Sequence, residues 1–122
     1  MVTESKVVLL VDDDHRFIES CKRIFKKTDL ILIPASTPDI AMSLIKQMQF
    51  HAIISDEHMP FLRGTQLLKK TKILQPKALR ILITGQPSLE IALQAVNNSE
   101  VHRFFAKPFS AKELIEYIQG SR

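Results

Sequence analysis

The sequence predicts an α/β fold: a doubly wound, five-stranded parallel sheet with five flanking helices. Short apolar runs of four or five residues alternate along the chain with longer stretches in which apolar residues recur at helical spacing. The runs are apolar throughout, as expected for strands whose two faces are both covered by helices. Five such units fill the 122 residues, so we expect one domain, 1–122.

Each strand is one of the apolar runs, and each helix begins at a capping signal. The predicted strands are 7–11, 30–33, 52–55, 79–83 and 103–106. Helices are expected to start at Asp14, at Thr37 with Pro38 in the first turn, after Gly64, near Ser88 and at Ser110. The third helix should end before Pro76, and the fourth near Asn98.

Apolar residues at helical spacing indicate which helix faces are buried. The predicted inward sets are Phe17, Cys21, Ile24 and Phe25; Ile40, Ala41, Leu44, Ile45 and Met48; Leu67, Leu68 and Leu74; Ile91, Ala92, Ala95 and Val96; and Leu114, Ile115 and Ile118. Cys21 is the lone cysteine and therefore has no partner for an internal disulfide. Its place in the first set favours a buried core residue.

The composition is that of a soluble globular protein, with 45% hydrophobic and 25% charged residues. The formal net charge is +4, but the basic residues occur as scattered pairs on polar helix faces. Direct binding of nucleic acid is therefore not expected. No run is long enough to cross a bilayer, and the first residues lack the features of a secretion signal. We expect a cytoplasmic protein without membrane association.

Four of the five predicted strands end on a residue that can bind phosphate or metal. These residues are the Asp12–Asp13 pair, Asp56, Thr84 and Lys107. In open parallel α/β sheets, ligands bind outside the carboxyl ends of the strands, where the strand order reverses. The carboxylates, a hydroxyl and an ammonium group should therefore converge on one site.

Crowded carboxylates favour a bound cation. Neighbouring acids raise one another's pKa, and a metal ion relieves the repulsion. Carboxylates with water and phosphate oxygens suit Mg²⁺. Asp56 stands alone at its strand end and is the candidate nucleophile toward phosphorus, whereas Asp12 and Asp13 are better placed to hold the ion. Lys107 would then bind a phosphoryl oxygen, and Thr84 would donate a hydrogen bond.

Four ordered motifs resemble the CheY-like receiver domain of two-component response regulators. They are the stretch from Val7 to Asp14, the string Ser55-Asp56-Glu57-His58-Met59-Pro60 followed by Gly64, the string Ile83-Thr84-Gly85, and the string Ala106-Lys107-Pro108-Phe109. The resemblance extends over essentially the whole chain. It implies a flavodoxin-like sheet of strand order 2-1-3-4-5.

The resemblance also implies roles for single residues. Asp56 would accept a phosphoryl group from the phosphohistidine of a sensor histidine kinase or a phosphotransfer protein. Asp13, Asp56 and the backbone carbonyl of His58 would ligate Mg²⁺, Asp12 would act on the ion mostly through water, and Lys107 would pair with the phosphate. Such a domain is not an enzyme for an external substrate, because it catalyses only its own phosphotransfer and autodephosphorylation.

Switching in this family implies that Thr84 moves toward the phosphoryl group and that Phe104 turns inward. Phosphorylation would then bias a two-state equilibrium. The readout face would comprise the helix 88–98, the strand 103–106 and the helix that starts at Ser110. An output domain or a partner protein would bind this face, which could also form a homodimer.

The chain departs from the family pattern at three positions beside the acceptor. Arg63 stands where many members carry an acidic residue, and Glu57 and His58 stand where neutral or small residues are also common. These residues could alter phosphorylation or the lifetime of the phosphorylated state. In the family pattern the Lys107–Pro108 bond is typically cis. The segment from Asn97 to Pro108 resembles receivers attached to HD-type cyclic-dinucleotide phosphodiesterases.

Two other functions are compatible with parts of the pattern. Asp12-x-Asp14, Thr84 and Lys107 follow the order of haloacid-dehalogenase-like phosphatases, although Arg16 stands where such enzymes usually have Thr or Val, and no acidic pair follows Lys107 at a strand end. A receiver-like module that does not signal is the second alternative. It would be expected to lose the acceptor, the lysine or the acidic pair, and this chain keeps all three. Nucleotide-binding glycine motifs do not occur.

Overall fold

Five parallel strands form one sheet in the computed structural model, which describes residues 6–85, 101–107 and 110–120. The strand order is β2-β1-β3-β4-β5, as the family resemblance implied. The strands are β1 (Lys6–Val11), β2 (Leu30–Ala35), β3 (Ala52–Asp56), β4 (Leu79–Thr84) and β5 (Arg103–Ala106). The order reverses between β1 and β3, which places a switch point beside the end of β1.

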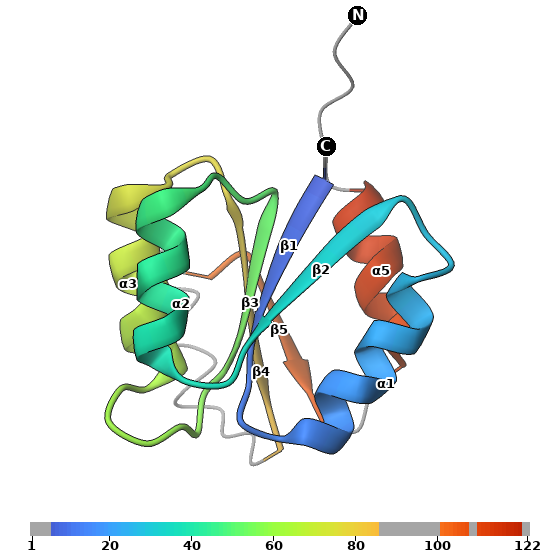
Figure 1. Ribbon diagram of the computed structural model, residues 1–122, viewed down its shortest axis with the longest axis horizontal. Coiled ribbons are helices and arrows are strands. Elements are labelled where there is room, and N and C mark those ends of the chain that lie inside the picture. Colours follow the sequence, from blue (N-terminus) through green and yellow to red (C-terminus); the bar gives the residue numbers. More distant parts are fainter. Residues whose placement is uncertain (1–5, 86–100, 108–109, 121–122) are drawn as a thin grey trace, which may run out of the picture.

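Helices cover both faces of this sheet. Within the described residues they are α1 (His15–Phe25), α2 (Pro38–Gln47), α3 (Gly64–Leu74) and α5 (Ala111–Gly120). Figure 1 shows α2 and α3 on one side of the sheet and α1 and α5 on the other. The doubly wound arrangement predicted from the sequence is therefore confirmed.

The core consists of two layers because side chains alternate across each strand. Val8 and Leu10 of β1 pack with α1 and α5, in a cluster that includes Cys21 and Leu114. Leu9 of β1 and its neighbours pack with α2 and α3 on the other face. Burial on both faces explains why the strands are apolar throughout rather than alternating.

The predicted helix starts are confirmed where the structure describes them. The Asp14 side chain accepts hydrogen bonds from the backbone N–H groups of Arg16 and Phe17 and thereby caps α1. The Thr37 hydroxyl accepts from Ile40 N at 3.2 Å. The Ser110 hydroxyl accepts from Lys112 N at 3.1 Å. Each bond satisfies one of the N–H groups that a helix start leaves without a partner.

Three residues predicted to face inward are exposed: Ile24, Ile40 and Leu74, at 37%, 46% and 45%. The buried stripes are narrower than the apolar patterns suggested. In α1 the stripe is Ile18, Cys21 and Phe25, and Ile24 lies about 100° from Phe25 around the helix. In α3 the inward position after Leu74 is taken by the polar residue Gln75, which is 3% exposed.

Two sequence predictions lie outside the described residues: the helix from Ser88 to Asn98 and the cis bond between Lys107 and Pro108. The predicted strands are confirmed, and most of the observed strands are slightly longer than predicted. β3 and β4 each include one further residue, Asp56 and Thr84, and β2 continues through Pro34 to Ala35. In the described part of the chain, no helix has the length and apolar character needed to span a membrane.

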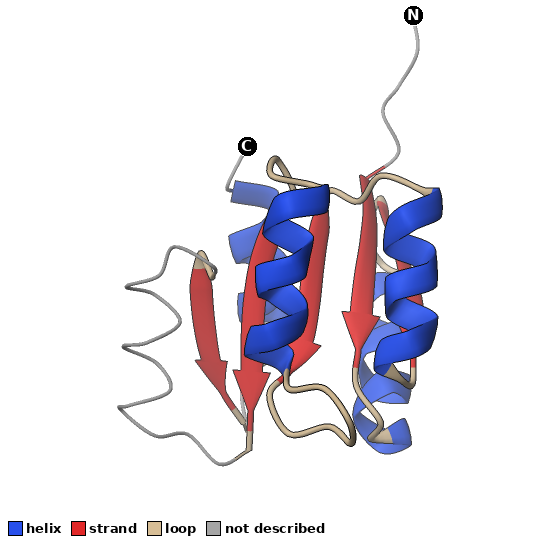
Figure 2. Ribbon diagram, turned by 90° about the vertical axis from the view of Figure 1, so that its left-hand side faces the viewer, coloured by secondary structure: helices blue, strands red, loops and turns tan. Residues whose placement is uncertain are grey.

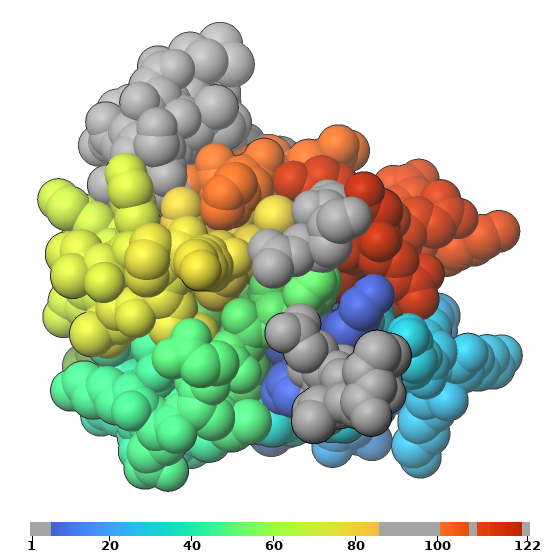
Figure 3. All heavy atoms as spheres, turned by 90° about the horizontal axis from the view of Figure 1, so that it is seen from above, coloured from blue at the N-terminus to red at the C-terminus, as the bar shows by residue number. Residues whose placement is uncertain are grey.

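All five strands run in the same direction, so their carboxyl ends meet at one edge of the sheet (Figure 2). The opposite edge, where the strands begin, faces the viewer in Figure 3, with α2 and α3 on one side and α5 on the other. Polar residues that follow different strands are therefore close together only at the carboxyl edge.

The side chain of Gln75 links three segments at the end of α3. Its amide nitrogen donates to the carbonyl oxygens of Ile45 and Met48, both at 2.8 Å, and its amide oxygen accepts from Phe50 N at 2.9 Å. The residue is buried. One side chain thus joins the end of α2 and the chain that enters β3 to the end of α3.

We predict that Gln75→Leu lowers the free energy of unfolding by about 2 kcal/mol or more, because buried backbone groups lose their partner. Urea denaturation would measure the change. Gln47→Leu is the matched control, since the Gln47 amide is exposed and bonds only to Ser43 among the described residues. Equal stability of the two variants would contradict the structural role of Gln75.

Candidate functional site

Asp12 lies at the carboxyl edge of the sheet and is fully buried. It follows β1 directly and continues its pairing with β2, because Asp12 N donates to Ala35 O at 3.1 Å. One carboxylate oxygen accepts from Asp14 N at 2.9 Å, and the other accepts from Lys107 Nζ at 2.9 Å. Both oxygens of this carboxylate therefore already have a hydrogen-bond donor.

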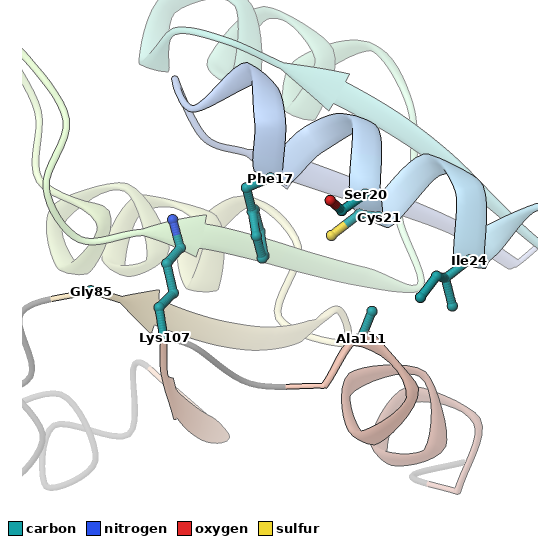
Figure 4. Close-up of a pocket in the computed structure, with 7 residues that line it drawn as sticks. All are labelled: Phe17, Ser20, Cys21, Ile24, Gly85, Lys107 and Ala111. Atoms are coloured by element: carbon teal, nitrogen blue, oxygen red, sulfur yellow. The ribbon is translucent and has the colours of Figure 1, made fainter.

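Lys107 comes from the other end of the sheet, directly after β5. Its side chain is 20% exposed, and its ammonium group lies 4.4 Å from the centre of the Phe17 ring. Figure 4 shows the lysine beside this ring. An aromatic face attracts a cation, so Phe17 helps to hold the ammonium group over the site. Sequence reasoning assigned Phe17 to the core and missed this contact.

A pocket of about 600 Å³ adjoins Lys107 between α1 and α5 (Figure 4). Cys21 and Ile24 line it from α1, and Ala111 lines it from α5. Burial raises the pKa of the Cys21 thiol to about 12, and the charge of Asp12 adds to this effect. The thiol is therefore protonated and unreactive, as expected for the core residue predicted from the sequence.

Three carboxylates meet at this edge: Asp12, Asp13 and Asp56. One oxygen of each lies within 4.8 Å of the others. Asp12 and Asp56 are buried and Asp13 is exposed. The sequence predicted this convergence, and the spacing suits a divalent cation that keeps some of its water. Because Asp12 already accepts two hydrogen bonds, Asp13 and Asp56 are the more available ligands.

The environment of Asp56 raises the pKa of its carboxyl group from 3.8 to about 6. Burial is the main cause, and the negative charges of Asp12 and Asp13 add to it. Lys107 and a backbone hydrogen bond from His58 act in the opposite direction. At neutral pH most of the Asp56 population is therefore ionised, as a nucleophilic carboxylate must be.

Thr84 and Phe104 occupy the positions that the sequence assigned to them. Thr84 is the last residue of β4 and is fully buried, and its carbonyl oxygen accepts from Lys107 N at 2.7 Å. Phe104 lies on β5 beside Leu82 and is partly buried against the α2–α3 side of the core. The roles of both residues in switching stay predictions.

His58 lies on the loop that follows Asp56, and its side chain is exposed. Its backbone lowers the pKa of the Asp56 carboxyl group, so the influence of His58 on the acceptor comes from its backbone. The preceding residue, Glu57, is only 1% exposed, and its carboxylate accepts from Thr65 at the start of α3. The sequence marked Glu57 as unusual but gave no sign that it is buried.

The start of α3 lies directly against the acceptor strand. A Cβ added to Gly64 would collide with the carbonyl oxygen of Asp56. Any larger residue would force the backbone apart, which explains why a glycine is required here. The loop after Asp56 therefore leaves the strand and returns to it within eight residues.

Comparison with known proteins identifies this arrangement. The model of the response regulator receiver domain family matches residues 8–119. The chain belongs to this family. Receiver domains bind a divalent metal ion at an acidic pocket, and Asp12, Asp13 and Asp56 form that pocket here.

Similar receiver domains occur in longer regulators. The chain is 28% identical over 112 residues to the hydrogenase transcriptional regulatory protein HoxA of Bradyrhizobium diazoefficiens. The matched region covers 92% of this chain but only 23% of that regulator. The chain therefore spans about a quarter of this relative's length.

Two solved structures support the same assignment. The signal receiver domain of an HD domain-containing protein from Pseudomonas fluorescens Pf-5 superimposes with a TM-score of 0.90 at 27% identity, covering 99% of this chain and 89% of that one. The second is a response regulator from Burkholderia pseudomallei, solved with a phosphorylated aspartic acid, a calcium ion and citrate. It superimposes with a TM-score of 0.85 at 25% identity, and the match covers 96% of this chain and 71% of that one.

The raised pKa of Asp56 predicts how this receiver's stability depends on pH without divalent cations. The unfolded carboxyl ionises near pH 3.8 and the folded one near pH 6, so the free energy of unfolding falls as pH rises through this range. Asp56→Asn removes this loss and should stabilise the protein at pH 7.5, on the order of 1–3 kcal/mol.

Thermal and urea unfolding in EDTA at pH 4 and pH 7.5 would test this. The advantage of Asp56→Asn should be small at pH 4 and larger at pH 7.5. Asp29→Asn, at an exposed position between α1 and β2, controls for the change in net charge. An advantage of Asp56→Asn that does not grow with pH would contradict the raised pKa.

Proposed function

We propose that this receiver accepts a phosphoryl group on Asp56 from the phosphohistidine of a sensor histidine kinase or a phosphotransfer protein, with Mg²⁺ as the cation. The observation that carries the proposal is the position of Asp56. Its carboxylate ends a central strand, has two further carboxylates beside it, and is influenced by the charge of Lys107. Histidine kinases and output domains are the partners of the family as a whole.

The transfer is a substitution at phosphorus. A carboxylate oxygen of Asp56 forms a bond to phosphorus while the phosphorus–nitrogen bond of the phosphohistidine breaks. The electron pair of that bond returns to the imidazole nitrogen of the donor. Asp56 must be ionised for this step, and its pKa of about 6 leaves it so at neutral pH.

Four residues would contribute to the cation site. Asp13 and Asp56 offer carboxylate oxygens, His58 would offer its backbone carbonyl, and Asp12 would act through water because both of its oxygens already accept hydrogen bonds. When bound, Mg²⁺ supplies positive charge that offsets the charge on the equatorial phosphoryl oxygens. The close approach of three carboxylates supports this assignment.

Lys107 and Thr84 would bind the transferred group. The Lys107 ammonium group lies next to Asp12 and retains 20% exposure, so one of its N–H groups can turn to a phosphoryl oxygen. Thr84 would donate its hydroxyl to another oxygen, and Phe104 would then turn inward. This change would alter the face formed by β5, α5 and the predicted helix 88–98.

That face would control an output domain or a partner protein and could carry a homodimer. We propose that residues 1–122 form one cytoplasmic domain of a response regulator. The similarity to the receiver of a Pseudomonas fluorescens HD domain-containing protein supports an HD-type phosphodiesterase output. The function of the module is signalling, and its only chemistry would be its own phosphorylation and dephosphorylation.

The phosphatase alternative requires Asp12 as the nucleophile. The buried Asp12 carboxylate already accepts from Asp14 N and Lys107 Nζ, which disfavours attack on a substrate. The module that does not signal is disfavoured because the acceptor, the acidic pair and the lysine all converge.

We predict that acetyl phosphate with Mg²⁺ adds one phosphoryl group to the protein, seen by intact mass spectrometry. Asp56→Asn should abolish the addition because it removes the nucleophile, whereas Asp29→Asn should retain it. Incorporation that persists in Asp56→Asn would refute the assignment of Asp56. Turnover of a phosphate ester that depends on Asp12 would instead support the phosphatase.

We also predict that Mg²⁺ raises the melting temperature, because the three carboxylates converge only in the folded chain. At a concentration 100-fold above the dissociation constant, the stabilisation is about 2.7 kcal/mol. Asp13→Asn should reduce it strongly, and Asp39→Asn, a change at an exposed position in the first turn of α2, should not. A thermal shift assay from zero to 20 mM MgCl₂ would measure both, and an unchanged wild-type melting temperature would favour the module that does not signal.

A further inference from the structure

Glu57 is a buried acid next to the phosphate acceptor, and its carboxylate binds the start of a helix. One oxygen accepts from Thr65 N at 2.8 Å, and the other accepts from the Thr65 hydroxyl at 3.2 Å. The residue is 1% exposed. Burying a carboxylate costs free energy unless hydrogen bonds compensate, so this contact has a stabilising function within the loop.

The backbone of Glu57 is fixed as well. Its N–H donates to Ile83 O of β4 at 2.9 Å, and its carbonyl oxygen accepts from Gly64 N at 3.1 Å. Side chain and backbone together therefore close the loop between Glu57 and Thr65 at its base. The missing Cβ of Gly64 permits this closure, because a side chain there would collide with Asp56 O.

The backbone N–H groups at the start of α3 need a hydrogen-bond acceptor from outside the helix. The residue before α3 is Arg63, whose guanidinium group has donors but no acceptor. Gln66 satisfies the N–H of Arg63 at 3.0 Å, and Glu57 satisfies the N–H of Thr65. A carboxylate is also favoured at a helix N-terminus by the helix dipole.

The closed loop contains a strained residue. Phe61, at the outer part of the loop, has a φ of 74° and is fully exposed. A left-handed backbone is unfavourable for a bulky residue and persists only where the surrounding structure imposes it. A hydrogen bond from Leu62 N to Pro60 O at 2.9 Å closes a three-residue turn around Phe61, and the hydrogen bonds at the base of the loop fix the two ends of the segment that carries it.

The loop carries the backbone that faces Asp56. His58 directly follows Glu57, and its backbone lies close enough to the Asp56 carboxyl group to lower the pKa of that group. We propose that Glu57 is a positioning residue for the cation site: its contact with Thr65 holds the His58 backbone in place to complete that site. The inference rests on the proposed Mg²⁺ site and assigns to Glu57 a role in building it.

Partners that orient metal-binding groups without touching the metal strongly affect affinity. Changing them typically weakens binding about 10- to 100-fold. We therefore expect Glu57→Ala to weaken Mg²⁺ binding about tenfold or more. Glu57→Gln should stay within about twofold of the wild type, because its amide can accept from Thr65 N and donate to the hydroxyl.

Isothermal titration calorimetry with MgCl₂ on the 122-residue chain would give the dissociation constants. Thr65→Val removes only the longer bond and should weaken binding about threefold. Thr71→Val is the matched control, because it removes a buried hydroxyl that bonds to Leu67 O at 3.0 Å on the same helix, away from the site. It should lower the melting temperature and leave Mg²⁺ affinity unchanged.

The outcomes separate three explanations. Unchanged Mg²⁺ affinity in Glu57→Ala, with a lower melting temperature, would overturn the inference and leave Glu57 a purely structural role. Glu57→Gln as weak as Glu57→Ala would also overturn it, since charge rather than hydrogen bonding would then matter. If Glu57→Ala does not fold, the Mg²⁺ affinities of Thr65→Val and Glu57→Gln still test the inference. A wild type that does not bind Mg²⁺ would refute the proposed cation site itself.

Discussion

The ion pair between Lys107 and Asp12 is the interaction on which the site depends. It joins the ends of β5 and β1, and the ends of β4 and β3 lie between them in the sheet. A fully buried carboxylate is costly without a partner, and removing one member of a buried pair leaves an uncompensated charge. Asp12 is therefore tolerated in the core because β5 delivers a lysine to it. Asp12 after β1 and Lys107 after β5 thus hold each other in place on either side of the ends of β3 and β4.

This constraint also explains the electrostatics of the acceptor. Lys107 offsets part of the negative charge beside Asp56 but not all of it, so burial and the remaining carboxylates keep the Asp56 pKa high. The site is thus left with an excess of negative charge, which a divalent cation can neutralise. Burial and this excess together raise the pKa of Asp56 to about 6, so its carboxyl group is still mostly ionised at neutral pH.

The sequence predicted the sheet and the convergence of Asp12, Asp13 and Asp56, because uniformly apolar runs and the polar residues that end them are local signals. It did not predict the exposure of Ile24, because the width of a buried helix face is set by tertiary packing. The contact of Glu57 with Thr65 was also missed, since a carboxylate in a loop gives no sign of burial or of its partner. Both missed features depend on the packing of side chains, which the pattern of residue types along the chain does not specify.

The proline in β2 has a consequence for assembly. Ala35 directs its carbonyl toward Asp12 N of the neighbouring chain segment, so the preceding residue, Pro34, has its backbone nitrogen on the outer side of the sheet. That nitrogen carries no hydrogen, and the outer edge of β2 therefore lacks one of the donors that an added strand would require. The missing donor disfavours growth of the sheet by strand addition at this edge.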